Sequence, residues 1–183
     1  GWAMMNFGLI TWGPSYLAQA RGFDLKQLGG AMAVIFVCGF LGSLTAGFGA
    51  DALQRRGLPR SLVLKAMLCL SGLGVLAAFL LLPTIADPVA AVALLSATVF
   101  LLCFGSLYWS FPALLAPADK VGLVGGMMNF AGSLGGIAIP IIAGMILQAT
   151  GSYTVVLHFF AGCAALYILG TLLVPLAGRE AAR

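Results

Sequence analysis

The chain has 183 residues, of which 62% are hydrophobic and 8% are charged, and its formal net charge is +4. Soluble globular domains carry about 25% charged residues, so this sequence has too little polar surface to coat a water-soluble domain. The composition predicts an integral membrane protein, and the positive charge is not interpreted as a nucleic-acid-binding signal.

Apolar runs separated by turn residues divide the chain into segments long enough to cross a bilayer. We expect an all-α protein with six transmembrane helices, at about 1–20, 28–50, 61–82, 89–114, 121–147 and 154–176. Strands of a transmembrane barrel would need alternating runs of only about 10 residues. The first run lacks the basic start and cleavage site of a secretory signal, so we interpret the chain as a fragment that begins in or just before a span.

The first two spans already contain small and polar residues. Asn6 is expected well inside the bilayer, in the first span. In the second span, Gly39, Ser43 and Gly47 recur at helical spacing, which is typical of a surface where helix backbones approach closely. Asp51 follows at the end of this helix, where the helix dipole disfavours a carboxylate. Pairing with Arg55 would relieve this, and we favour a structural role for Asp51.

Basic residues predict the orientation of the spans. Seven of the nine Lys and Arg residues fall on one side, after the second, fourth and sixth spans: Arg55, Arg56, Arg60, Lys65, Lys120, Arg179 and Arg183. Only Arg21 and Lys26 fall on the other side. Because short cytoplasmic loops are enriched in Lys and Arg, we expect this side and the C-terminus to be cytoplasmic.

The fourth span contains a polar and aromatic cluster before Pro112, made of Ser106, Tyr108, Trp109 and Ser110. An interfacial aromatic belt is the simple interpretation. However, Ser106 and Trp109 are deeper than such a belt usually lies. They are therefore candidates for a site inside the membrane.

The fifth span, GLVGGMMNFAGSLGGIAIPIIAG from Gly122 to Gly144, combines many glycines with one asparagine. Gly132 and Gly136 form a GxxxG pair, which predicts close helix packing. An unpaired amide in hydrocarbon costs about 2–7 kcal/mol, so Asn129 is expected to face a helix partner or a wet cavity. Asn129 and Pro140 fall in a series of residues at helical spacing, so we expect them on one broad face of this helix. Bent helices of this kind line the substrate path in transporters.

Three segments carry a resemblance to a known family. GFGADALQRRG resembles the inner-loop signature of the major facilitator superfamily, with Gly47, Asp51, Arg55 and Arg56 at its glycine, acidic and paired basic positions. TWGPSYLAQARGF (11–23) and GGMMNFAGSLGGIAIPIIAGMILQATGSY (125–153) resemble its anion:cation symporter branch, which includes proton-coupled carriers of sugar acids. The resemblance implies the C-terminal six-helix half of a transporter, built as two inverted three-helix repeats at about 1–85 and 86–183.

The same resemblance implies the roles of individual residues. Asn129, Ser106 and Trp109 match positions that contact the substrate in this branch, while Tyr108 stands where a small hydroxyl residue is common. With Asn6, these are the candidate substrate-binding residues. Gly47, Asp51, Arg55 and Arg56 are the candidate gating loop. The expected partners are an organic anion, protons, the lipid bilayer and an N-terminal half that supplies the intramembrane charges. The protein is expected in the inner membrane of the cell. No cofactor or metal is expected.

Two other interpretations remain open from the sequence. Ser106 in the fourth span and His158 in the sixth would suit a six-span intramembrane serine protease, although the sequence around Ser106 lacks the glycine expected after the serine. A structural membrane subunit or a truncated product without transport activity would have the same pattern of spans. The four cysteines, Cys38, Cys69, Cys103 and Cys163, lie in separate apolar runs and are interpreted as small hydrophobic residues.

Overall fold

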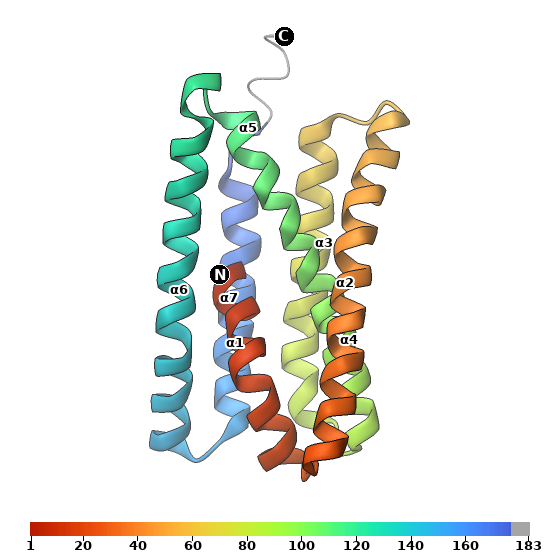
Figure 1. The fold of residues 1–183 in the computed structure, drawn as a ribbon, viewed down its shortest axis with the longest axis vertical. Coiled ribbons are helices and arrows are strands. Elements are labelled where there is room, and N and C mark those ends of the chain that lie inside the picture. Colours follow the sequence, from red (N-terminus) through yellow and green to blue (C-terminus); the bar gives the residue numbers. More distant parts are fainter. Residues whose placement is uncertain (177–183) are drawn as a thin grey trace.

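The computed structural model describes residues 1–176, and in this range it is a bundle of long helices without strands (Figure 1). This confirms the predicted all-α membrane fold. The elements are α1 (Trp2–Ser15), which continues as the π-helix η1 (Tyr16–Ala20), α2 (Leu25–Arg55), α3 (Arg60–Leu81), the 3-10 turn η2 (Leu82–Thr84), α4 (Pro88–Leu102), the 3-10 segment η3 (Cys103–Ser110), α5 (Phe111–Leu115), the 3-10 turn η4 (Ala118–Lys120), α6 (Val121–Thr150) and α7 (Tyr153–Leu173).

Five helical runs of the described chain are long and apolar enough to cross a membrane: residues 25–55, 60–84, 88–115, 118–150 and 153–173. The segment formed by α1 and η1 is not one of them, in keeping with its Asn, Thr, Pro and Gln residues. The second helix begins earlier than predicted because Asp24 and Gln27 form a reciprocal capping box at its start. The fifth ends later than predicted, at Thr150, and is followed by Gly151, whose φ of 63° suits glycine.

The fourth span is not one regular α-helix. Between α4 and α5 the chain winds as a 3-10 helix for eight residues, Cys103–Ser110, immediately before the helical turn that contains Pro112. Runs of 3-10 helix longer than three or four residues are uncommon, and such a stretch within a helix often accompanies function. This interruption of the helix lies beside Pro112 and contains the whole polar and aromatic cluster.

The charged loops gather at the two ends of the bundle. The connection from α2 to α3 and the connection from α5 to α6 lie at the same end, which is the upper end in Figure 1. They carry Arg55, Arg56 and Lys120. The segment with Arg21 and Lys26 lies at the opposite end. The predicted separation of charge is thus present among residues 1–176, whereas Arg179 and Arg183 lie outside the described residues.

Glycines allow two helix pairs to approach closely. On α6, a Cβ atom added at Gly136 would lie 2.7 Å from the Phe7 ring of α1. On α2, a Cβ added at Gly42 would lie 2.2 Å from the carbonyl oxygen of Phe100 in α4. The predicted packing role is confirmed at Gly136, whereas a Cβ at Gly132 would make an ordinary contact, 3.5 Å from the Ala3 side chain. By contrast, a Cβ at Gly47 would meet nothing within 4 Å, so this glycine faces open space.

Arg21 joins the outer ends of two helical segments. Its guanidinium donates to the Tyr16 hydroxyl at 2.7 Å and to the Leu82 carbonyl at 3.0 Å. Tyr16 is only 2% exposed and stacks on Trp12 with ring centroids 5.1 Å apart. The side chain of Arg21 therefore fastens the end of η1 to η2.

We expect Arg21→Ala to lower the free energy of unfolding by about 1–3 kcal/mol, because it removes the charge-assisted hydrogen bonds to the Tyr16 hydroxyl and the Leu82 carbonyl. Thermal unfolding in detergent followed by circular dichroism measures this. Lys26→Ala, at an exposed position on the same side, is the matched control and should change stability by no more than about 0.5 kcal/mol. Equal stability of the two variants would contradict the role of Arg21.

Candidate functional site

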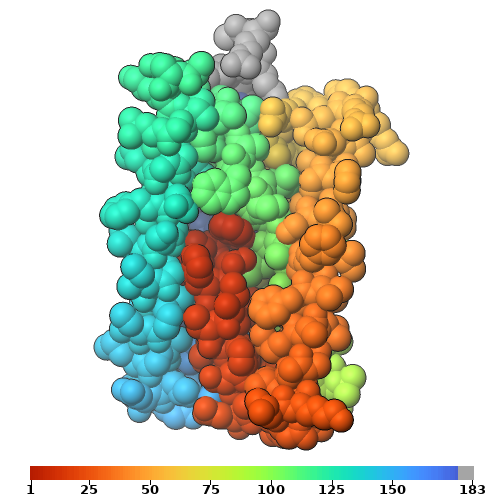
Figure 2. Space-filling view, in the orientation of Figure 1, coloured from red at the N-terminus to blue at the C-terminus, as the bar shows by residue number. Residues whose placement is uncertain are grey.

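One face of the bundle is hollowed between helices. In Figure 2, α6, α1 and α2 lie side by side across this face, and the segment from η3 to α5 lies behind and above the start of α1. A cavity of about 530 Å³ is formed here by residues of α1, η3, α6 and α7. Its lining includes Asn6, Phe7, Tyr108, Trp109, Asn129, Ser133 and Tyr167. We call it the asparagine cavity.

Asn129 projects from α6 into the asparagine cavity. Within residues 1–176 its amide has no hydrogen-bond partner, and the residue is exposed. Asn6 lines the same cavity from α1, also without a partner in the described chain. Because unpaired amides in hydrocarbon are costly, both side chains suit a space filled by water or by a polar ligand.

The 3-10 winding of η3 sets the opposite wall of the asparagine cavity. Gly105 leaves room for Trp2, since a Cβ atom there would lie 1.9 Å from the indole nitrogen. The Trp2 indole N–H therefore reaches the Leu102 carbonyl, to which it donates at 2.8 Å. Trp109, which is 51% exposed, and the half-buried Tyr108 follow on η3 and line the cavity.

Two tyrosines of this wall are hydrogen-bonded away from it. The Tyr108 hydroxyl bonds to the hydroxyl of Thr171 on α7. The Tyr167 hydroxyl bonds to Ser71 on α3 at 2.8 Å. The Tyr108 and Tyr167 rings meet edge to face with centroids 5.6 Å apart. This network joins η3, α7 and α3 behind the cavity and stabilises the positions of both rings.

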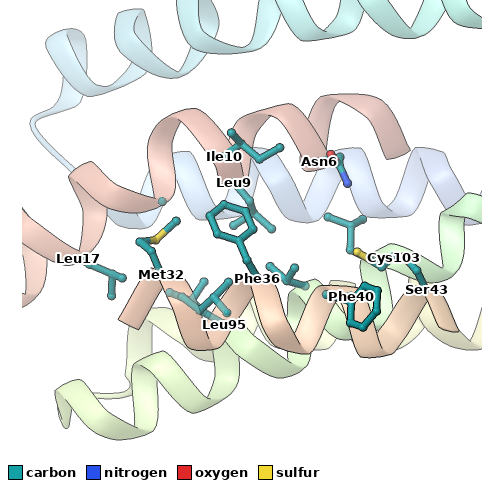
Figure 3. A pocket seen from close by; sticks show the side chains of 15 residues that line it. Asn6, Leu9, Ile10, Leu17, Met32, Phe36, Phe40, Ser43, Leu95 and Cys103 are labelled. Atoms are coloured by element: carbon teal, nitrogen blue, oxygen red, sulfur yellow. The ribbon is translucent and has the colours of Figure 1, made fainter. Parts of the chain in front are cut away.

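A second, more apolar cavity of about 240 Å³ lies between α1, α2 and α4 (Figure 3). Asn6 lies toward the end that holds Ser43 and Cys103, while Leu17 and Met32 lie toward the other end. Asn6 lines both cavities. Among the residues that line either of them there is no Asp, Glu, Lys or Arg.

The structure brings together most of the predicted substrate-binding residues. Asn129, Trp109, Tyr108 and Asn6 all line the asparagine cavity. Ser106 lines neither of the two cavities described above. Its role in substrate contact stays a prediction.

The predicted gating loop lies far from the asparagine cavity, at the charged end of α2. Asp51, Arg55 and Arg56 are all exposed there. Within residues 1–176, Asp51 forms neither the expected ion pair with Arg55 nor any other ion pair. The exposed acid and bases of this loop are free to contact other groups.

Sequence reasoning missed Tyr167 and Thr171. The two residues are four apart on the sixth span, so they share one helix face, and their hydroxyl groups were the available signal. Which way that face turns depends on how α7 packs against α3, and the sequence alone does not specify it. Thr171 is fully buried and Tyr167 is 2% exposed.

The protease interpretation finds no support in the geometry. In the described chain, Ser106 and His158 share no hydrogen bond. His158 is exposed on the part of α7 near its start, whereas Ser106 lies in the middle of η3. A nucleophile and its general base need to be within hydrogen-bond reach of each other. These two residues do not form such a pair.

Comparison with known proteins gives a consistent set of matches. The model of the Major Facilitator Superfamily matches residues 1–140. The chain is 34% identical over 142 residues to the D-galactonate transporter of Escherichia coli O6:H1, covering 78% of this chain and 33% of that protein. It is 36% identical over 154 residues to a probable sulfoacetate transporter of Cupriavidus necator, covering 84% and 35% of the two chains.

A probable galactarate/D-glucarate transporter of Bacillus subtilis is 32% identical over 171 residues. That match covers 93% of this chain and 37% of the relative. The chain thus spans about a third of the length of the curated relatives it matches.

Proposed function

Because the chain belongs to the major facilitator superfamily, we propose that it is the C-terminal half of a secondary active transporter for a sugar acid or a related organic anion. The relatives are named as transporters of galactonate, sulfoacetate and galactarate or glucarate. They confirm the predicted resemblance to sugar-acid carriers and the prediction that the chain is not an enzyme. In the same proposal, the chain is built as two inverted three-helix repeats, residues about 1–85 and 86–183.

The observation that carries the proposal is the asparagine cavity itself. It combines an unpartnered amide, Asn129, with the aromatic side chains of Trp109 and Tyr108 on the hollowed face of the bundle. In this proposal Asn129, Asn6 and Trp109 contact the substrate through neutral hydrogen bonds and ring contacts. Ser106 contributes at the edge of the site.

The proposed site needs a second half to bind an anion. The lining of the asparagine cavity has no basic side chain to neutralise a carboxylate and no acidic one to carry a proton. Charges inside a membrane usually belong to coupling machinery. We assign the substrate-binding cation and the proton-coupling carboxylates to an N-terminal six-helix half that packs on the hollowed face, with alternating access by rocking of the two halves.

The charged loops fit a defined orientation in this proposal. We propose that the protein lies in the inner membrane. The end of the bundle with Arg55, Arg56 and Lys120 then faces the cytoplasm, because basic residues are enriched in cytoplasmic loops. Gly47 and Asp51 then lie on the last turns of α2 at the cytoplasmic end, where they contact the other half. The open space beside Gly47 leaves room for such a contact.

Complementation between two halves tests the proposal. This chain alone is expected to give no uptake of labelled galactonate, galactarate or sulfoacetate into proteoliposomes, because it lacks the charged partner groups. Co-reconstitution with an N-terminal half from a related carrier is expected to restore uptake of at least one anion, driven by an inward proton gradient. Uptake by the chain alone would contradict the proposal, as would tight association of the two halves without uptake of any organic anion.

A further inference from the structure

We propose that Ser133 is a further specificity-determining residue of the asparagine cavity, and that it binds the hydroxylated carbon chain of a sugar acid rather than its carboxylate. This inference rests on the proposed function and narrows its ligand from organic anions in general to polyhydroxylated acids. Ser133 follows Asn129 by one turn of α6 and lines the same cavity.

The Ser133 hydroxyl is available to a ligand. Serine and threonine hydroxyls inside helices commonly donate to a backbone carbonyl three or four residues earlier. In α4, Ser96 does so to Val92 at 2.8 Å and Thr98 does so to Leu94 at 2.7 Å. Ser133 is exposed on the cavity and has no hydrogen-bond partner in the part of the chain that the structure describes. Its hydroxyl can therefore both donate to and accept from a ligand.

The close packing of α1 and α6 sets the register of their side chains. Both helices run toward the lower end of Figure 1. A Cβ atom added at Gly132 would lie 3.5 Å from the Ala3 side chain, and one at Gly136 would lie 2.7 Å from the Phe7 ring. Asn6 comes between Ala3 and Phe7 in α1. It is therefore between the levels of Gly132 and Gly136, closer to that of Gly136.

Ser133 consequently falls between the two asparagines of the cavity. It is four residues after Asn129, which puts the two side chains on one face of α6 and about 6 Å apart along the helix axis. Asn6 lies about 3 Å further along the same direction. An amide, a hydroxyl and a second amide thus follow one another over about 9 Å. We call Asn129, Ser133 and Asn6 the polar strip.

A sugar acid matches the polar strip in length and in chemistry. An extended six-carbon chain measures about 6 Å from its first to its last carbon, given C–C bonds of about 1.5 Å, and the oxygens at both ends lengthen its reach. Amides and hydroxyls both donate and accept, as ligand hydroxyls do, whereas a carboxylate only accepts. A carboxylate against the strip would leave the acceptor atoms of the strip without protons, while a hydroxylated chain satisfies donors and acceptors together.

The other polar side chains of the cavity lining do not offer this combination. The Trp2 indole N–H donates to the Leu102 carbonyl at 2.8 Å. The hydroxyls of Tyr108 and Tyr167 bond to residues of α7 and α3 behind the cavity. Trp109, on the opposite wall, is 51% exposed and adds an indole N–H, which can only donate. The polar strip is therefore the part of the lining that suits the hydroxyl groups of a ligand.

Two dicarboxylates of equal chain length test this: galactarate, with a hydroxyl on every inner carbon, and adipate, without hydroxyls. Dissociation constants are measured by isothermal titration of this chain assembled with an N-terminal half in lipid nanodiscs. The unchanged chain is expected to bind galactarate more tightly than adipate. Ser133→Ala is expected to weaken galactarate binding about 5- to 20-fold and to change adipate binding by no more than about twofold, because only galactarate loses a hydrogen-bond partner.

Two further variants separate the hydroxyl from the shape of the helix. Ser133→Thr keeps the hydroxyl and should stay within about threefold of the unchanged chain for galactarate. Ser110→Ala is the matched control, since the Ser110 hydroxyl donates to the Leu107 carbonyl at 2.7 Å and does not line the cavity. It should leave both dissociation constants within about twofold.

The outcomes distinguish the inference from the proposed function. An unchanged galactarate affinity in Ser133→Ala would overturn the inference and leave an organic-anion carrier. An equal loss for both dicarboxylates, or an equal loss in Ser133→Ala and Ser133→Thr, would overturn it as well, because Ser133 would then act through packing. Binding of sulfoacetate or adipate without binding of any hydroxylated acid would have the same meaning. Binding of none of these anions, galactonate included, would contradict the proposed function itself.

Discussion

Replacing Asn129 with alanine is expected to weaken substrate binding by the assembled carrier about 10- to 100-fold. A ligand hydrogen bond in a partly desolvated site is worth about 1–3 kcal/mol when its partner would otherwise remain unpaired. In residues 1–176 the amide has no partner to lose, so its removal should leave the stability of the bundle almost unchanged. Binding titrations and thermal unfolding of the same preparation measure both effects.

Phe130→Ala is the matched control for Asn129→Ala. The neighbouring Phe130 is 66% exposed and does not line the asparagine cavity. Its truncation should leave the dissociation constant within about twofold. An unchanged substrate affinity in Asn129→Ala would remove Asn129 from the site. A large loss of thermal stability in that variant would instead indicate that the amide pairs with a helix in the complete carrier.

The sequence was sufficient to predict the all-α membrane fold and to nominate residues that share one cavity, for physical reasons that can be traced to single residues. Asn129 was predictable because an amide in a long apolar run is costly unless it meets a polar partner. Trp109 and Ser106 became candidates because they lie too deep for an interfacial belt, whereas Tyr108 became one through the family resemblance. The arguments for Asn129, Trp109 and Ser106 depend only on the position of each residue along its own span.

The remaining features depend on how the helices pack. The hydrogen-bond partner of the Tyr108 hydroxyl becomes known only when η3 and α7 are placed together, and that of the Tyr167 hydroxyl only when α7 and α3 are. The 3-10 winding from Cys103 to Ser110 has no simple sequence signature beyond the nearby Pro112. Interhelical contacts of this kind are set by the rotation of each helix about its axis.

The rotation of α2 about its axis also determines which of its glycines make close contacts with other helices. The spacing of Gly39, Ser43 and Gly47 predicted the packing face, and Gly39 does pack against Val99 of α4. Gly47 at the end of this series instead faces open space. The closest approach is made by Gly42, one residue before Ser43, so the real contact face is rotated from the predicted one.

Gly42→Ala is accordingly expected to lower the free energy of unfolding by roughly 3 kcal/mol. The added methyl carbon would lie 2.2 Å from the Phe100 carbonyl oxygen, 2.8 Å from its carbonyl carbon and 2.9 Å from its Cα. Because these are backbone atoms, no side-chain rotation relieves the overlap and α2 must move away from α4. Overpacking of a close contact usually costs about 1–3 kcal/mol, and the upper end applies where a backbone has to move.

Gly30→Ala, on the same helix, is the matched control for Gly42→Ala. A Cβ atom at Gly30 would meet nothing within 4 Å. Alanine there should raise helix stability by up to about 1 kcal/mol, as alanine generally does relative to glycine inside a helix. The two alanine variants should therefore shift thermal unfolding in opposite directions, although their sequence change is identical. If Gly42→Ala stabilised the protein as Gly30→Ala does, the close approach of α2 and α4 at Phe100 would be wrong, and so would the position of η3 that follows from it.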